Sequence, residues 1–224
     1  MSSIYQRAMG SDFARLHPKI QRRFGFSSED RCAAIGRGVM DRVWHGLPYT
    51  LPFLYVGTWR RIMFPQRARN VPFSVRNYAY RDRFGRETVT WVRDFGGPLD
   101  RRFDATMIYS ERRGRIVDYL GTHQHLAVDI DLGVDERGGL HLRSGAQRFY
   151  EGRVAFSFPM LFSGYADVHE WFDDAGQRYR ISVRVANPAW GPLFGYDGSF
   201  DVEWIPCDGA VPADVRPLRE ELRE

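Results

Sequence analysis

Apolar and polar residues alternate along most of the chain between Val71 and Ile205, in short runs separated by turns. The run from Leu126 to Leu132 is the clearest, because its even-numbered positions are apolar and its odd-numbered positions are small or charged. Side chains two residues apart lie on the same face of a strand. Short strands joined by short turns therefore predict a mainly β (α+β) fold, a curved antiparallel sheet or β-barrel of about ten strands.

The first part of the chain follows helical spacing instead, with apolar residues three or four positions apart. We therefore expect short N-terminal helices in residues 1–26 and the sheet in residues 35–205 of a single domain, 1–205. The segment 206–224 is polar and charged, and we expect it to fray or to form one exposed helical turn.

Residues 47–69 form a lid-like insert in this pattern, unusually rich in apolar and aromatic side chains and interrupted by Pro48, Pro52 and Gly57. A proline at the first helical position is favourable, so a short helix is expected to begin near Pro52. Two interpretations stay open: a buried connector that plugs one end of the sheet, or an apolar flap over a cavity that also contacts a membrane or a partner.

Charge and cysteine usage exclude some classes of protein. The 32 basic and 28 acidic residues give a net charge of only +4, and the arginines are scattered among carboxylates rather than gathered in a stripe, so no nucleic-acid partner is expected. The N-terminus shows no apolar signal region and no long uncharged apolar stretch occurs, so we expect a cytoplasmic protein without a transmembrane segment. Two cysteines do not make a disulfide framework.

A cluster of imidazoles and carboxylates offers the sharpest candidate chemistry. His123, His125 and Asp129 occupy odd positions, so on a strand their side chains leave the same face, and His141 follows. Two histidines and a carboxylate suit zinc, iron or manganese. The spacing is similar to the first metal motif of cupins, with Asp129 replacing the usual glutamate, although the glycine and proline spacing differs. If the even-numbered residues face the core, the odd face is instead solvated.

Aromatic residues suggest a second kind of site. The chain has 16 Phe, 11 Tyr and 6 Trp, and most are expected to pack in the core. A barrel of about ten strands is also wide enough to hold a ligand. An apolar pocket with a few polar groups is the usual small-molecule site, and the candidates are Asn77, Tyr78, Trp91, Arg93, Thr106 and Tyr109 on the strands, with Phe53 and Trp59 in the insert.

Nearly the whole chain, up to about Trp204, resembles a bacterial family catalogued as domain of unknown function 4166 (DUF4166). The matching stretches are Ile4-Tyr5, Leu16 to Pro18, Gly36 to Met40, Pro52 to Leu54, Val71 to Phe73, Phe84 to Trp91, Arg102 to Met107 and Phe194 to Gly198. Members of that family occur alone or behind a Rossmann-type dehydrogenase-like domain. The resemblance implies a free-standing domain with an accessory role beside redox enzymes, and it implies no catalytic residue.

Three functions are compatible with these observations. The first is non-catalytic binding of a small apolar, lipid- or isoprenoid-like ligand in a β-sheet cavity, or service as an accessory domain to a redox enzyme. The second is a cupin-like metal-dependent or histidine acid–base enzyme that uses His123, His125 and Asp129. The third is a protein-interaction module, with a redox enzyme or a second copy as partner. We expect binding rather than catalysis, and no cofactor unless the histidines hold a divalent metal.

Overall fold

The computed structural model describes residues 2–59, 61–97, 99–157, 164–189, 191–208 and 210–224; within α3 it leaves out the side chains at 52, 53 and 56. The strands are β1 Cys32–His45, β2 Ala68–Arg81, β3 Glu87–Phe95, β4 Arg101–Ser110, β5 Arg115–Leu120, β6 Leu126–Val134, β7 Leu140–Glu151, β8 Val154–Ser157, β9 Tyr165–Asp173, β10 Arg178–Asn187 and β11 Gly191–Pro206. The helices are α1 Ile4–Met9, α2 Pro18–Phe24 and α3 Leu51–Trp59, with the 3-10 turns η1 Gly10–Arg15, η2 Ser28–Asp30, η3 Pro48–Thr50 and η5 Ala213–Val215.

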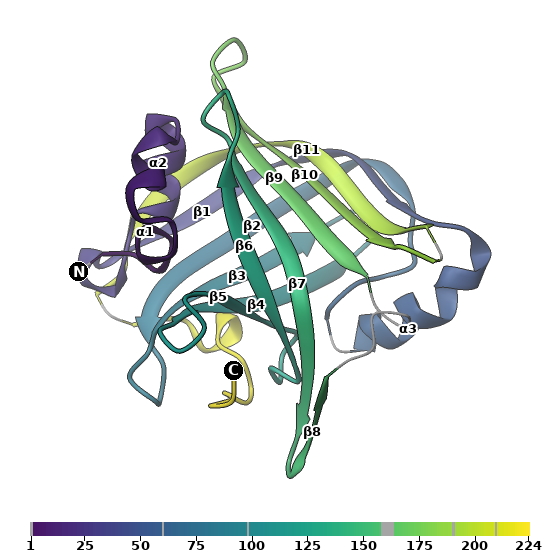
Figure 1. Cartoon of the computed structure of the whole chain (residues 1–224). Helices are drawn as coiled ribbons and strands as arrows, with labels where there is room; N and C mark the ends of the chain where they lie inside the picture. The colour runs from purple at the N-terminus through teal and green to yellow at the C-terminus, as the bar shows by residue number, and fades with distance from the viewer. Residues whose placement is uncertain (1, 60, 98, 158–163, 190, 209) are drawn as a thin grey trace.

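The eleven strands of these described ranges form one antiparallel sheet that closes on itself (Figure 1). Each strand from β1 to β6 pairs with the next, β6 pairs with β7, and β9, β10 and β11 lead back to β1. The result is a closed ten-stranded barrel with β8 as an extra strand on β7, so the predicted fold class is confirmed. Closure satisfies the edge groups that an open sheet would expose.

The alternation along β6 fixes which residues face inward. Val128 and Ile130 belong to the main core and expose 3% and 6% of their surface, whereas Asp131 is exposed. The even-numbered residues therefore point into the barrel and the odd-numbered residues point out. This is the orientation expected when one sheet face packs on a core.

The N-terminal helices close one end of the barrel (Figure 1). Helix α1 begins with a capping box between Ser3 and Gln6, which satisfies two backbone donors at its first turn. Pro18 occupies the first turn of α2. Both helices point their apolar side into the barrel, where Tyr5 and Phe24 are at most 2% exposed and meet edge to face at 4.9 Å. The expected N-terminal helices are confirmed.

The insert between β1 and β2 covers the opposite end. Phe64 is 1% exposed and packs edge to face on Phe95 and Phe194, with ring centroids 5.1 and 5.0 Å apart. Leu54 of α3 is equally buried. The insert is thus a plug, as one interpretation predicts. Its outer side nevertheless keeps large apolar side chains in solvent, namely Leu47, Tyr49, Tyr55 and Trp59.

The C-terminal segment packs on the barrel and does not fray, and of the two expected forms it takes the single helical turn, exposed at Ala213 and Asp214. It crosses the outer face of the barrel as an extended strap with one short 3-10 turn, η5. Asp214 pairs with Arg76 at 2.5 Å, Val215 is 2% exposed, and the Tyr119 hydroxyl donates to the Arg223 carbonyl at 2.9 Å. The many charges in this segment have partners on the barrel wall, which is why a polar sequence packs there. No helix in the described ranges is long and apolar enough to cross a membrane.

Candidate functional site

A group of charged and amide side chains lies inside the barrel, among the apolar residues of its core. Each exposes at most 7% of its surface: Arg23, Asn77, Arg93, Asp118 and Glu170. Arg23 enters from α2, and the others stand at inward positions of β2, β3, β5 and β9. Burying a charge costs several kcal/mol, on the order of 3–5, unless it is paired and hydrogen-bonded. The partners of these groups therefore decide what the interior can do.

Arg23 is the better-partnered arginine of this group, although its Nη2 has no hydrogen-bond partner among the described residues. Its Nε donates to the Glu170 carboxylate in an ion pair, and its Nη1 donates to Asn77 Oδ1 at 2.9 Å. Asn77 in turn donates from Nδ2 to the Thr90 carbonyl at 2.8 Å, where the β2–β3 ladder is interrupted. Burial raises the pKa of Glu170, while Arg23 opposes that rise. This set ties α2 to the barrel wall.

Arg93 is buried to a similar degree but is poorly partnered. Its Nη1 donates to the Tyr196 hydroxyl over a long 3.4 Å, and its guanidinium lies 3.7 Å above the centre of the Phe103 ring. In the part of the chain that the structure describes, no carboxylate oxygen lies within 4.0 Å of its nitrogens, and its Nε has no hydrogen-bond partner. A cation–π contact offsets part of the desolvation of the charge, but the charge itself is not neutralised.

Asp118 is the carboxylate that Arg93 influences. Burial raises the pKa of Asp118 to about 7, and the charge of Arg93 acts in the opposite direction. Its Oδ1 is buried and has no hydrogen-bond partner among the described residues. Near neutral pH this carboxyl is therefore protonated in a large share of molecules, so it does not supply Arg93 with a fixed negative charge. The arrangement is suited to an acidic group from outside the chain.

The ligand-binding residues predicted from the sequence divide between the two faces of the wall. Asn77, Trp91 and Arg93 face the interior, and the Trp91 Nε1 donates to the Tyr5 hydroxyl at 2.8 Å. Tyr109 lies at the α1 end, where the Arg7 guanidinium sits 4.6 Å above its ring.

Three other residues of that prediction do not line the interior. Tyr78 packs outside the barrel against Val215, and the Thr106 hydroxyl accepts from Gln124 beneath the C-terminal strap, because each stands one position off the inward parity. Trp59 is 78% exposed on α3. The side chain of Phe53 lies outside the described residues.

The predicted metal set of His123, His125, Asp129 and His141 is not assembled. Asp129 points outward and accepts hydrogen bonds from Arg113 and Arg148, 2.7 to 2.9 Å long, which lower its pKa against the effect of burial. His125 lies 2.8 Å from Glu151, and His123 lies beside Thr122 in the turn before β6. The reason is that Asp129 lies on the outer face of β6, whereas His123 and His125 precede that strand, with their ring centroids 5.4 Å apart.

His141 joins a different group on the outer face, with Asp135 and His169, whose ligand atoms lie within 4.8 Å of one another. His141 and His169 are opposed across β7 and β9, and their rings stack 4.0 Å apart at 9°. A metal lies in the plane of each imidazole that binds it, and these parallel planes do not converge on one point. Burial lowers the pKa of His169, so it is neutral near pH 7, and its Nε2 lies 2.8 Å from Asp135 Oδ2.

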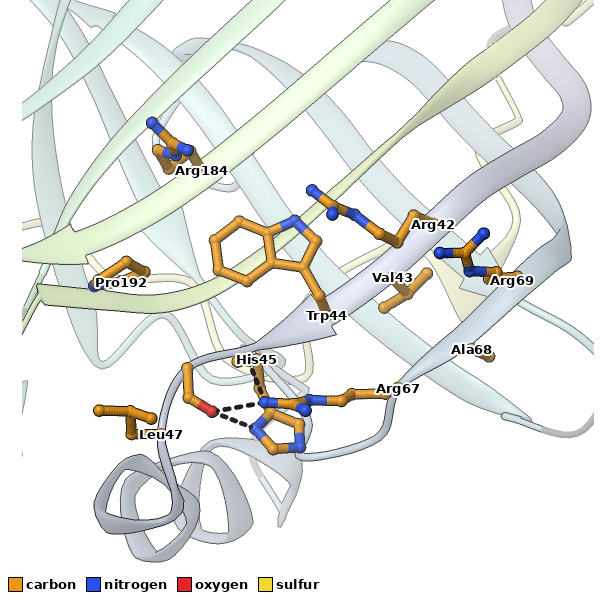
Figure 2. Close-up of a pocket in the computed structure, with 11 residues that line it drawn as sticks. Arg42, Val43, Trp44, His45, Leu47, Arg67, Ala68, Arg69, Arg184 and Pro192 are labelled. Carbon is orange, nitrogen blue, oxygen red and sulfur yellow. Dashed lines mark hydrogen bonds between the residues drawn. The ribbon is translucent and has the colours of Figure 1, made fainter.

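A second polar feature lies on the outer wall beside the insert (Figure 2). It is a cleft of about 660 Å³ with the Trp44 indole at its centre and four arginines around it: Arg42, Arg67, Arg69 and Arg184. Trp44 lies across Gly195 of the neighbouring strand, where a Cβ would come within 2.4 Å of the indole ring. Only glycine at that position leaves room for the indole, because any side chain would displace it.

Sequence reasoning missed much of both features. Asp118 stands between Val117 and Tyr119 in a strand, and its inward position follows from sharing a face with Ile116. That signal was present, yet a carboxylate in a strand is ordinarily taken to face solvent. The cleft had no comparable signal, because Trp44 and Arg184 meet only through strand register.

Two of the comparisons with known proteins found a match. A family model described as "Domain of unknown function (DUF4166)" matches residues 16–200. The chain is similar to "Uncharacterized protein YndH" from Bacillus subtilis (strain 168), with 30% identity over 204 residues, 91% of this chain and 98% of that protein. No solved structure matches.

Proposed function

The chain belongs to the DUF4166 family, and from its geometry we propose that it binds a small, largely apolar molecule with an acidic group inside the barrel. The ligand class is lipid- or isoprenoid-like, and binding is non-catalytic. The acidic group pairs with Arg93, and the apolar part lies along the inner wall. The insert that plugs one end acts as the lid that such a ligand must pass.

The single observation that carries this proposal is the unpaired charge of Arg93. A buried guanidinium without a carboxylate is costly to the fold, since desolvation of the cation is not offset by an ion pair. A bound carboxylate or phosphate would form charge-assisted hydrogen bonds with Arg93, and Nε, which has no partner in the described chain, is one of the donors it would meet.

The surroundings of Arg93 suit the rest of such a ligand. The inner wall near it is built from aliphatic and aromatic side chains, including Val75, Phe103 and Tyr196. Small-molecule sites are usually mostly apolar, with a few polar groups that fix orientation. A barrel of about ten strands has a wider interior than the eight-stranded barrels that hold one small ligand.

Native mass spectrometry tests the proposal on the protein as purified from cells. We expect a co-purifying acidic, apolar molecule in the wild type, its loss from Arg93→Met, and its retention in the control Arg115→Met, which removes an arginine from the outer wall. Circular dichroism verifies that both variants are folded. A wild-type protein that carries no such molecule and shows no thermal shift with long-chain fatty acids contradicts the proposal.

The redox-enzyme partner, the homodimer and the cytoplasmic location stay predictions. The enzyme alternative loses its metal set, because Asp129 is engaged by two arginines on the outer face. The exposed aromatic side chains of α3 are compatible with a partner-binding role.

A further inference from the structure

Two arginines of the Trp44 cleft stand directly opposite each other. Arg42 on β1 and Arg69 on β2 are cross-strand partners, and both are exposed on the outer wall. Like charges in this arrangement destabilise a sheet. The contact of Arg42 with Asp197, at 3.7 Å, offsets only one of the two charges weakly, because both groups are largely exposed. A pair of this kind is relieved by an anion that lies between its members.

The floor of the cleft adds a third arginine, Arg184. Gly195 on β11 pairs with Trp44 on one side and with Arg184 on the other, so the indole bridges the strand between them. In Figure 2 the indole lies between Arg42 and Arg184, with Arg69 beyond Arg42. A flat aromatic surface flanked by guanidinium groups can hold a planar or apolar group and an anion together.

The fourth arginine is fixed in position by the backbone. Arg67 donates from Nη2 to the carbonyls of His45 and Gly46, both at 2.9 Å. Arg69 and Arg184 make no ion pair or hydrogen bond with another side chain among the described residues. Four guanidinium groups thus border one cleft, and among the described residues the carboxylate within ion-pair distance of them is that of Asp197, while Asp167 is the cross-strand neighbour of Arg184.

We propose that this cleft binds a phosphate group whose attached planar or apolar part rests on Trp44. A phosphate is favoured over a carboxylate because it carries up to two negative charges and accepts paired hydrogen bonds from several guanidinium groups. The phosphate belongs either to a free phosphorylated molecule or to a lipid headgroup. This site lies outside the barrel, so it does not depend on the ligand proposed for Arg93.

The neighbouring insert bears on the choice between these two sources. Leu47 lines the cleft and is 62% exposed, and Tyr55 and Trp59, four residues apart on α3, are 63% and 78% exposed. Positions i and i+4 lie on one side of a helix. Exposed tryptophan and tyrosine next to arginines are typical of surfaces that meet the headgroup region of an anionic bilayer.

Isothermal titration with adenosine monophosphate tests the free-molecule source, and co-sedimentation with vesicles tests the lipid source. The vesicles are phosphatidylcholine alone or phosphatidylcholine with one fifth phosphatidic acid. The test variant is Arg69→Ser with Arg184→Ser. The matched control is Arg137→Ser with Arg153→Ser, which removes the same charge from two exposed turns elsewhere.

We expect binding in at least one arm, a loss of at least tenfold in affinity in the test variant, and no more than a twofold change in the control. Trp59→Ser is expected to weaken vesicle binding severalfold and to leave titration with adenosine monophosphate unchanged. Absence of binding in both arms overturns the proposal. Equal losses in the test and control variants overturn it as well, because the effect would then reflect net charge alone.

Discussion

Two arginines inside the same barrel differ in what surrounds them. Arg23 and Arg93 expose 2% and 5% of their surface, and both lie over aromatic rings. Arg23 has a carboxylate and an amide as partners, whereas Arg93 has one long hydrogen bond to a hydroxyl. The same chemical group at the same depth is thus neutralised by a carboxylate of the chain in one case and not in the other, although Nη2 of Arg23 also has no hydrogen-bond partner among the described residues.

The difference separates a charge that is paired within the chain from one that we propose is paired by a ligand. The ion pair of Arg23 with Glu170 joins residues 147 positions apart and holds α2 against β9. Such a buried pair adds little net stability, but it is costly to break. Arg93 has no carboxylate partner among the described residues, so its burial costs stability.

Breaking the ion pair between Arg23 and Glu170 should have the largest effect on stability. Glu170→Gln leaves Arg23 buried without a counter-charge, and we expect the free energy of unfolding to fall by about 3–5 kcal/mol. Urea denaturation measures the change. The control is Glu203→Gln, which removes the partner of Arg37 from an exposed pair and should cost at most about 1 kcal/mol. Similar losses in the two variants would mean that the Arg23–Glu170 pair has no special structural role.

The variant Asp118→Asn tests the surroundings of Arg93, the poorly partnered arginine, through the pH dependence of stability. Burial raises the folded-state pKa of Asp118 to about 7 from an ordinary value of 3.8, so the folded protein keeps a proton that the unfolded chain releases. The stability that this carboxyl contributes is therefore fully present below about pH 4 and is lost progressively as pH rises to about 7. Above about pH 7 its effect on stability no longer changes. Asn does not titrate. The difference in free energy of unfolding between Asp118→Asn and the wild type should therefore shift in favour of the variant by up to about 4 kcal/mol between pH 4 and pH 8.

Urea denaturation of both proteins at several pH values measures that gain. The control is Asp131→Asn on the exposed face of β6, which should show no comparable change between pH 4 and pH 8. A stability difference between wild type and Asp118→Asn that is the same at both pH values would show that Asp118 is ionised in the folded protein throughout, already paired with Arg93.

The sequence predicts the strands of the barrel wall better than the polar groups inside the barrel. The alternation in β6 identifies both the strand and its inward face once Val128 and Ile130 are placed in the core. By contrast, the glycines and prolines of residues 187–197 favour a loop over a strand, whereas β11 begins at Gly191. Phe194 and Tyr196 alternate inward there, and their neighbouring strands on both sides supply the hydrogen bonds that override local propensity.

The pairing of the polar groups inside the barrel could not be predicted from a single sequence, for a different reason. Arg23 and Glu170 read as ordinary charged residues of a helix and a strand, because their pairing depends on how α2 docks on a wall far along the chain. Arg93 is among the predicted ligand residues and points inward, and its role in binding a ligand stays a prediction. Its lack of a carboxylate is a property of the assembled barrel and has no signal in the sequence.

The most direct test compares an acidic ligand with its neutral counterpart at Arg93. The fluorescent fatty acid cis-parinaric acid and its methyl ester are titrated into wild type, Arg93→Met and the control Arg115→Met at pH 6. We predict that wild type and the control bind the acid at least tenfold more tightly than the ester, and that Arg93→Met binds the two with similar affinity. Equal preference for the acid in all three proteins would contradict the assignment of Arg93 as the group that holds the ligand.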